Sequence, residues 1–329
     1  MDYGIPPLPP NTSLASRSFL ITGATSGLGY ATALMALQLG ASPVYITARD
    51  VSKGTSTRDS LLADPVVKEN NPNAKVEVYA LDMARWEGVL GFADKFIDDR
   101  TASGEGLDIA ILNAGMFSIE YELAPTGNEM SIQVNHLSTS LLALLLLPLL
   151  EKSSTPDHTS RLTFITSVQH MTKYGRLTAC PPDNVNYLES LNDKATFDRT
   201  QRYGVSKTLL IYIVQHLATH VSPDKVIINN LCPGAIYTSI NRNMPIHSWP
   251  LLAWMWRHGN TPEAGARTYI QAVAVLGKES HGKWYQRGKH RKYGDFVRGL
   301  EGQKMREKEW KETMEVLEKV RPGISQVVA

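Results

Sequence analysis

Apolar runs alternate with helix-forming segments along most of this chain, and no other feature limits its fold as strongly. Each run is short and rich in β-branched residues, and several are almost continuously hydrophobic: "SPVYITA", "KVEVYAL", "LDIAILNAG", "RLTFITSV" and "KVIINNLCPG". Strands that are covered on both faces read in this way, and strands that alternate with helices form parallel sheets. The sequence therefore predicts an α/β fold with one doubly wound parallel sheet, helices on both faces, and a ligand crevice at the carboxyl ends of the strands.

Length and charge narrow the classes of function. The 329 residues, of which 43% are hydrophobic, can bury one large core, and we favour a single domain. A net charge of +2 favours neither nucleic acid nor an anionic membrane surface as the main partner. Cys180 and Cys232 show no metal-ligand spacing, so we expect no metal site, a reducing compartment and a cytoplasmic location.

The most apolar stretch, "LLALLLLPLL" at residues 141–150, is too short for a bilayer. As a helix it would span about 15 Å, whereas the hydrocarbon core of a bilayer is about 30 Å thick. We therefore expect a buried helix or a helix–helix interface rather than a membrane span.

Three glycines, Gly23, Gly27 and Gly29, lie between the first predicted strand at residues 19–21 and a predicted helix at residues 30–39. Glycines in such a turn let a ligand approach the backbone, and the N–H groups at the start of the helix attract phosphate. The pyrophosphate of a dinucleotide fits this turn best. The spacing Gly-x-x-x-Gly-x-Gly differs from the common Gly-x-Gly-x-x-Gly pattern, so a plain strand–helix connection stays open as the alternative.

Seven short motifs occur in one order along the chain: "TGATSGLG" (residues 22–29), "LD" (81–82), "NAG" (113–115), "VNHLST" (134–139), "ITS" (165–167), "YGVSK" (203–207) and "PG" (233–234) followed by Thr238. Their order and spacing resemble the short-chain dehydrogenase/reductases over residues 14–275, and within them the branch that holds retinol dehydrogenases and fungal secondary-metabolite reductases. The resemblance implies a single Rossmann-type domain at 14–275, an arm at 1–13 and a C-terminal helical extension at 276–329. It also implies an NADP-dependent oxidoreductase that transfers hydride between the nicotinamide and a hydrophobic ketone or secondary alcohol, for example in secondary-metabolite biosynthesis.

The chemistry of carbonyl reduction explains the "YGVSK" motif. A tyrosine hydroxyl with its ordinary pKa of ~10 is a poor acid–base group near neutrality. Lys207 lies one helical turn beyond Tyr203, so its ammonium is expected beside the phenol, where it would lower the tyrosine pKa. The resemblance further implies that Ser167 hydrogen-bonds the substrate oxygen and that Asn135 orders a water linking Lys207 to solvent.

The end of the second predicted strand indicates which cofactor is bound. "YITARD" offers Arg49, which can clamp an extra phosphate, and Asp50, which we interpret as the cap of the next helix. We therefore expect NADP(H) rather than NAD, with Ser26 adding a hydroxyl contact to the same phosphate. By resemblance Asp82 bonds the adenine and Asn113 packs beneath the cofactor, and the other cofactor contacts are Gly23, Gly27, Leu28, Gly29, Tyr203, Lys207, Ile236 and Thr238.

Two segments depart from the common pattern of the family. An insertion at residues 168–202, polar and rich in turns, separates Ser167 from Tyr203. We expect it to form the rim of the site and to take part in substrate selection, with a solvated loop as the alternative. Residues 239–260 gather tryptophans and methionines, which suits a lid over a hydrophobic substrate, with core packing and peripheral membrane contact as the alternatives.

The extension begins with a basic and aromatic stretch, "GKESHGKWYQRGKHRKYGDFVRG", which invites a nucleic-acid interpretation. We reject it because the residues that follow nearly balance acids and bases and place Trp310, Met314, Leu317 and Val320 at helical spacing, as in an amphipathic helix packed on a domain. A redox sensor and an isomerase or dehydratase on the same fold are the alternative functions, and a homodimer is an open alternative for the assembly. Such sensors tend to lose the tyrosine or the lysine, and both are present here.

Overall fold

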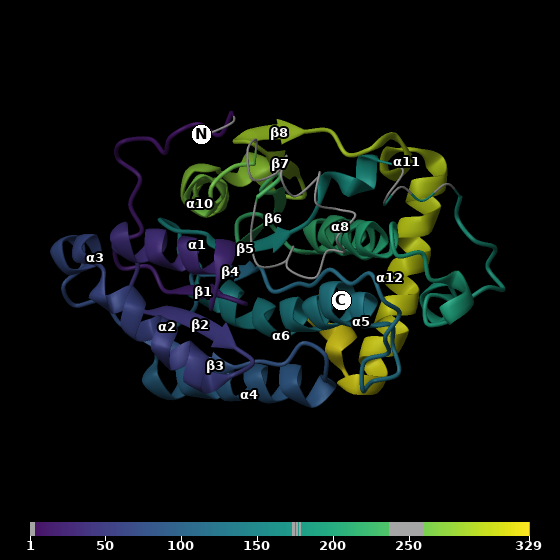
Figure 1. The fold of residues 1–329 in the computed structure, drawn as a ribbon, viewed down its shortest axis with the longest axis horizontal. Coiled ribbons are helices and arrows are strands. Elements are labelled where there is room, and N and C mark those ends of the chain that lie inside the picture. Colours follow the sequence, from purple (N-terminus) through teal and green to yellow (C-terminus); the bar gives the residue numbers. More distant parts are fainter. Residues whose placement is uncertain (1–3, 173–174, 176, 178, 237–258, 329) are drawn as a thin grey trace.

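The computed structural model describes residues 4–172, 175, 177, 179–236 and 259–328 of the chain. Among these residues, eight strands form one sheet in the order β3-β2-β1-β4-β5-β6-β7-β8 (Figure 1). Neighbouring strands are parallel except for the antiparallel pair β7 and β8. The strands are β1 (Phe19–Ile21), β2 (Val44–Ala48), β3 (Val76–Ala80), β4 (Ile109–Leu112), β5 (Ser160–Ile165), β6 (Val226–Cys232), β7 (Trp284–Gln286) and β8 (Lys289–Arg291). The prediction of a parallel α/β sheet is confirmed.

Helices cover both faces of this sheet, which explains why the strands read as continuous apolar runs. In β1, Phe19 and Ile21 belong to one buried apolar cluster and Leu20 belongs to the other, on the opposite face. The helices on the first face are α1 (Gly27–Gln38), α2 (Val51–Ala63), α3 (Pro65–Asn70) and α10 (Pro262–Ile270). Those on the second face are α4 (Trp86–Ser103), α6 (Ser138–Ser153) and α8 (Arg202–His220).

The apolar stretch at 141–150 belongs to a longer helical segment than its sequence suggests. Met130–Ser153 is continuous: the short helix α5 (Met130–Ile132) leads through a π-helical turn (Gln133–Leu137) into α6. The segment's 24 residues are long and apolar enough to cross a membrane, so the length argument made from ten residues was wrong. However, 94% of its most apolar window is buried inside the protein, as predicted for a core helix.

The described part of the extension at 276–329 first adds two strands to the sheet and then forms a long helix that packs on α8. Strands β7 and β8 fall within residues 276–329, so the sheet continues past the expected domain boundary at residue 275. Helix α12 (Leu300–Val320) runs beside α8 (Figure 1), with Leu317 buried and Trp310 and Met314 packed against the same core. The predicted amphipathic helix is confirmed. The shorter helical elements are α7 (Tyr187–Ser190), α11 (Asp295–Arg298) and single turns at Val168–Met171, Lys194–Thr196, Gln271–Val275, Lys278–Ser280 and Ile324–Val328.

Candidate active site

The glycine turn after β1 has a backbone that other residues could not follow without strain. Gly23 and Gly27 have positive φ angles of 68° and 57°. A Cβ on Gly29 would lie 2.3 Å from the carbonyl oxygen of Gly23, which is closer than real Cβ atoms come. Helix α1 begins at Gly27, with Ser26 in an extended conformation before it. The turn therefore presents bare backbone and a helix N-terminus at one edge of the sheet, which suits a pyrophosphate.

Asn113, which follows β4, holds this turn from below. Its side-chain amide donates to the carbonyl oxygens of Thr22 at 2.8 Å and of Gly23 at 3.3 Å. The hydroxyl of Tyr269, a wholly buried residue of α10, donates to the side-chain oxygen Oδ1 of Asn113 at 2.9 Å. These three bonds fix the orientation of the amide. The predicted place of Asn113 beneath the cofactor turn agrees with this geometry.

Three polar residues follow β2 and β3 at the same edge. Asp50 caps α2: its Oδ1 accepts from the backbone N–H groups of Ser52 at 2.9 Å and Lys53 at 3.3 Å, as predicted. A hydrogen bond from the Ser52 hydroxyl, together with these two backbone bonds, lowers the Asp50 pKa. Arg49 is exposed beside it, and Asp82 accepts from the Ala84 N–H at 3.0 Å. The Asp50 carboxylate is already bound by the backbone of α2, so the exposed Arg49 is the charged side chain here that can bind an anionic ligand.

Tyr203 and Lys207 lie on the first turns of α8, opposite the end of β5. The Lys207 ammonium donates to the carbonyl oxygen of Ile165 at 2.9 Å and lies 5.9 Å from the centre of the Tyr203 ring. The Ser167 side chain hydrogen-bonds Tyr203, and Ser167 Oγ also accepts from the Gln169 N–H at 3.2 Å. The structure thus brings together the serine, tyrosine and lysine that the sequence singled out.

The charge states of this pair differ from the expectation. Burial raises the pKa of Tyr203, and the hydrogen bond from Ser167 offsets this only in part. Burial also lowers the pKa of Lys207, to about 8. The net shift of the Tyr203 pKa is therefore opposite to the predicted lowering, because loss of solvent disfavours the charged form of both groups. The hydroxyl of Tyr203 keeps its proton near neutrality and is a proton donor rather than a phenolate.

Asn135 lies behind the pair, in the π-helical turn. Its side-chain oxygen Oδ1 accepts from the Met116 N–H at 2.8 Å. Its side-chain nitrogen Nδ2 donates to the Met116 carbonyl oxygen at 2.8 Å and to Ser206 Oγ at 3.0 Å. Ser206 Oγ in turn donates to the Tyr203 carbonyl oxygen at 2.7 Å. Asn135 thus ties the loop after β4 to the first turn of α8.

Comparisons with known proteins agree with this geometry. A family model described as short chain dehydrogenase matches residues 17–179. A short chain dehydrogenase of Arthrobotrys oligospora is 37% identical over 324 residues, which cover 97% of this chain and 97% of that protein. This chain belongs to the short-chain dehydrogenase family. The short-chain dehydrogenase/reductase tropG of Talaromyces stipitatus is 32% identical over 96% of this chain and 95% of its own length.

Solved structures share the fold of this dehydrogenase. The Pseudomonas aeruginosa RhlG/NADP active-site complex covers 85% of this chain and 97% of its own, with a TM-score of 0.64 at 22% identity. L-Sorbose reductase from Gluconobacter frateurii, complexed with NADPH and L-sorbose, covers 84% and 96%, with a TM-score of 0.61 at 22% identity. The predicted Rossmann-type fold and membership among fungal short-chain dehydrogenases are confirmed. The chain is an oxidoreductase of CH–OH and C=O groups that uses a nicotinamide cofactor.

Sequence reasoning missed two residues near the site of this dehydrogenase. Tyr269 was not singled out, although its hydroxyl orients Asn113. Cys232, considered from the sequence only as a possible metal ligand, is buried at the end of β6 and lies close enough to affect the pKa of Tyr203 and of Lys207. Burial raises the pKa of its own thiol. A signal for Cys232 was present, since it directly precedes the "PG" motif, whereas nothing in the sequence near Tyr269 marks it.

The remaining predicted contacts are described only in part. Leu28 and Ile236 lie side by side at α10, where a Cβ on Gly265 would come within 2.4 Å of Leu28 and 2.9 Å of Ile236. Thr238 and residues 239–258 of the predicted lid lie outside the described residues. The roles assigned to Ser26, Arg49, Asp82 and these residues therefore stay predictions.

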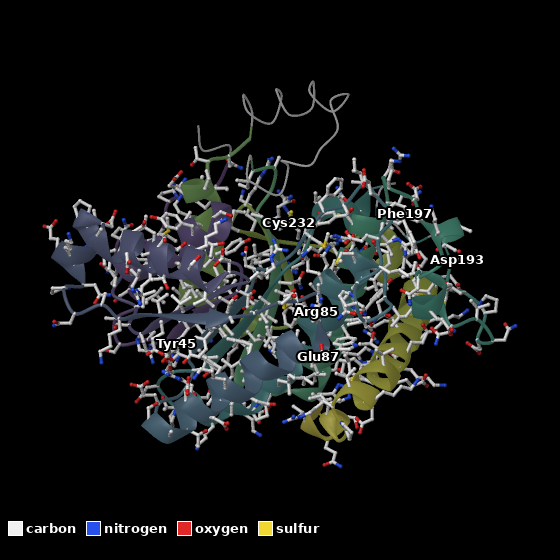
Figure 2. The ribbon with its side chains drawn as sticks, turned by 60° about the horizontal axis from the view of Figure 1, so that its bottom comes forward. Tyr45, Arg85, Glu87, Asp193, Phe197 and Cys232 are labelled. Carbon is white, nitrogen blue, oxygen red and sulfur yellow. The ribbon has the colours of Figure 1, made fainter. Side chains whose placement is uncertain are left out.

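The insertion at 168–202 is anchored rather than fully solvated. The Glu312 carboxylate of α12 accepts from the N–H groups of Tyr187 at 3.0 Å and Leu188 at 2.9 Å. Asp193 and Phe197, from the same insertion, lie toward one side of the molecule, whereas Cys232 lies near its middle (Figure 2). A simple solvated loop does not describe this part of the insertion, because its backbone is held by α12.

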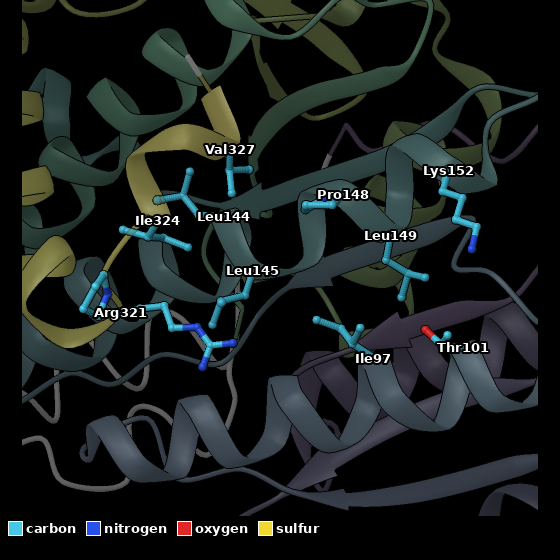
Figure 3. Close-up of a pocket in the computed structure, with 12 residues that line it drawn as sticks. Ile97, Thr101, Leu144, Leu145, Pro148, Leu149, Lys152, Arg321, Ile324 and Val327 are labelled. Carbon is cyan, nitrogen blue, oxygen red and sulfur yellow. The ribbon is translucent and has the colours of Figure 1, made fainter.

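A cavity of about 400 Å³ lies elsewhere, between α4, α6 and the turn at Ile324–Val328 (Figure 3). Its lining is mostly aliphatic: Ile97, Leu144, Leu145, Pro148, Leu149, Ile324 and Val327, with Thr101, Lys152, Arg321, Pro322 and Gly323. None of the predicted site residues lines it. We place the active site at the carboxyl edge of the sheet, where the groups able to transfer a proton converge.

Proposed function

We propose that this protein is an NADP(H)-dependent reductase or alcohol dehydrogenase that acts on a hydrophobic ketone or secondary alcohol. The observation that carries the proposal is the convergence of Ser167, Tyr203 and Lys207 at the same sheet edge as the glycine turn. The cofactor fits this edge, because the turn leaves Gly23 exposed with a positive φ and ends at the N-terminus of α1, whose backbone N–H groups suit phosphates. When bound, the nicotinamide supplies or accepts the hydride.

The side chains divide the remaining work between them. Ser167 donates a hydrogen bond to the substrate carbonyl oxygen and so holds it beside Tyr203. Tyr203, protonated because burial raises its pKa, gives its proton to that oxygen as the carbonyl is reduced. Lys207, held by the Ile165 carbonyl oxygen, supplies positive charge that stabilises the phenolate left behind. In the oxidation direction the same residues act in reverse order.

Arg49 supports NADP as the cofactor. It is exposed directly after β2, and the neighbouring Asp50 is bound to its own helix, so the acidic side chain is not available to select NAD. A guanidinium there can hold the 2′-phosphate through charge-assisted hydrogen bonds. The fungal relatives support a role in secondary metabolism, and the predicted lid supports a hydrophobic substrate.

The test measures kcat/KM with NADPH and NADH for wild type and Arg49→Ala, on a panel of hydrophobic ketones. Hydrogen bonds to charged groups contribute about 1.5–3 kcal/mol, and about 1.4 kcal/mol corresponds to tenfold. The NADPH-to-NADH ratio should therefore fall by roughly ten- to a hundredfold. Arg58→Ala, which removes a partly exposed arginine paired with Asp59 on α2, is the matched control and should leave the ratio unchanged. An unchanged ratio in Arg49→Ala would contradict the assignment of NADP.

A further inference from the structure

The π-helical turn that carries Asn135 is an unusual element in the middle of a long helix. Gln133–Leu137 interrupts the α-helical pattern of Met130–Ser153. Such turns are rare, occur mostly as single turns inside α-helices, and lie frequently at functional sites. Contacts outside the turn must therefore stabilise it, and they come from its two neighbouring residues, Asn135 and His136.

His136 faces away from the site, toward α12. Its Nε2 lies 3.0 Å from Glu309 Oε1 and 3.0 Å from Thr313 Oγ1, and the Thr313 hydroxyl donates to Glu309 Oε1 at 2.7 Å. All three side chains are fully buried. Glu309 Oε1 thus lies within hydrogen-bond distance of both His136 and Thr313. A carboxyl group buried this deeply is costly without such partners, so the contact has one strongly favoured geometry.

The two neighbours couple α12 to the reacting groups. Consecutive helical residues project about 100° apart, so any rotation of His136 about the helix axis rotates Asn135 with it. Asn135 holds both main-chain groups of Met116 and, through Ser206, the carbonyl oxygen of Tyr203. The chain of contacts thus runs from Glu309 through His136 and Asn135 to the proton donor.

Helix α12 is anchored independently of Glu309. Leu317 is buried in the core, Glu312 binds two backbone N–H groups of the insertion, and Arg321 pairs with Asp94 at 3.1 Å. Removing the Glu309 carboxylate should therefore leave α12 in place and free only the π-helical turn. A substitution of Glu309 can therefore distinguish a role of this residue in docking α12 from a role in positioning the active site.

From this geometry we infer that Glu309 is a positioning residue for the active site, acting through His136 on Asn135. The inference rests on the proposed function, since Asn135 matters for turnover only if Tyr203 and Lys207 transfer the proton. It assigns to α12, which lies outside the family pattern of motifs, a part in the reaction.

The experiment compares Glu309→Leu and Glu309→Gln with Glu315→Leu, a matched control at an exposed position of α12. For Glu309→Leu we expect kcat to fall about tenfold or more, while the Kd for NADPH stays within about threefold, because the glycine turn is untouched. Amide hydrogen exchange at Met116, whose N–H is bound by Asn135, should become about tenfold faster, without a similar change across α8. Glu309→Gln should recover most of both values because its amide oxygen still accepts from His136 and Thr313.

The outcomes are distinct. Wild-type kcat and wild-type protection of Met116 in Glu309→Leu would overturn the inference. So would an equal loss of protection throughout the fold, with the Kd for NADPH rising as kcat falls. If Glu309→Leu does not fold, Thr313→Val removes one donor to Glu309 at constant shape and takes its place, with the same two measurements. A wild-type enzyme with no turnover on any carbonyl or alcohol would contradict the proposed function instead, and the exchange at Met116 would still decide the inference.

Discussion

Gly115→Ala tests the active-site geometry with a single methyl group. A Cβ at Gly115 would lie 3.0 Å from Asn135 Oδ1 and 3.2 Å from Lys207 Nζ, both tighter than ordinary van der Waals contact. Asn135 is held by three hydrogen bonds, so the lysine must move, which stretches its 2.9 Å bond to the Ile165 carbonyl oxygen. A hydrogen bond to a charged group contributes about 1.5–3 kcal/mol, so its partial loss should lower kcat by roughly tenfold.

The assay is steady-state reduction with saturating cofactor, read beside thermal unfolding of the same samples. Gly91→Ala is the matched control: nothing lies within 4 Å of the added Cβ, and alanine in a helix interior stabilises by about 0.5–1 kcal/mol relative to glycine. This control should keep full turnover. A Gly115→Ala enzyme with wild-type kcat would refute the reasoning, because it would show that Lys207 can leave its place without cost.

Three further outcomes are expected. Tyr203→Phe should abolish turnover while NADPH still binds, since it deletes only the proton donor; near-normal reduction measured with this variant would contradict the mechanism. Burial lowers the Lys207 pKa to about 8, so its positive charge is present below that pH and is lost above it. The kcat/KM for reduction should therefore be level near neutrality and fall as the pH rises through about 8. A profile that stays level up to pH 10.5 would mean that Lys207 titrates as an ordinary lysine. Tyr269→Phe removes the donor to Asn113 and should weaken NADPH binding about three- to tenfold by titration, with kcat at saturation little changed; unchanged affinity would mean that Asn113 needs no such support.

The sequence predicted the layout of the sheet and the site because both depend on local patterns. Apolar runs covered on two faces identify parallel strands, and the residues that end them, such as Asn113 and Ser167, share one edge for topological reasons. The cap at Asp50 followed from side-chain chemistry alone. Each of these predictions needed no knowledge of contacts between distant segments.

The parts that the sequence could not predict depend on burial and on pairs far apart in the chain. Whether Lys207 lowers the pKa of Tyr203 is decided by how much solvent both lose, which spacing on a helix does not show. Tyr269 meets Asn113 only because α10 packs on α1. Strands β7 and β8 lack an apolar run long enough to mark them: "KHR" in β8 is exposed and polar throughout.

The position of α12 also bears on how the enzyme is synthesised. A ribosome completes every strand of the sheet before it reaches residue 300, so the α/β layers can assemble while α12 is still unmade. Until then the imidazole of His136 and the apolar side of α8 face water, an open surface that favours aggregation. A chain terminated between β8 and α12 would carry every catalytic side chain and yet be a poor enzyme and a ready substrate for chaperones and proteases.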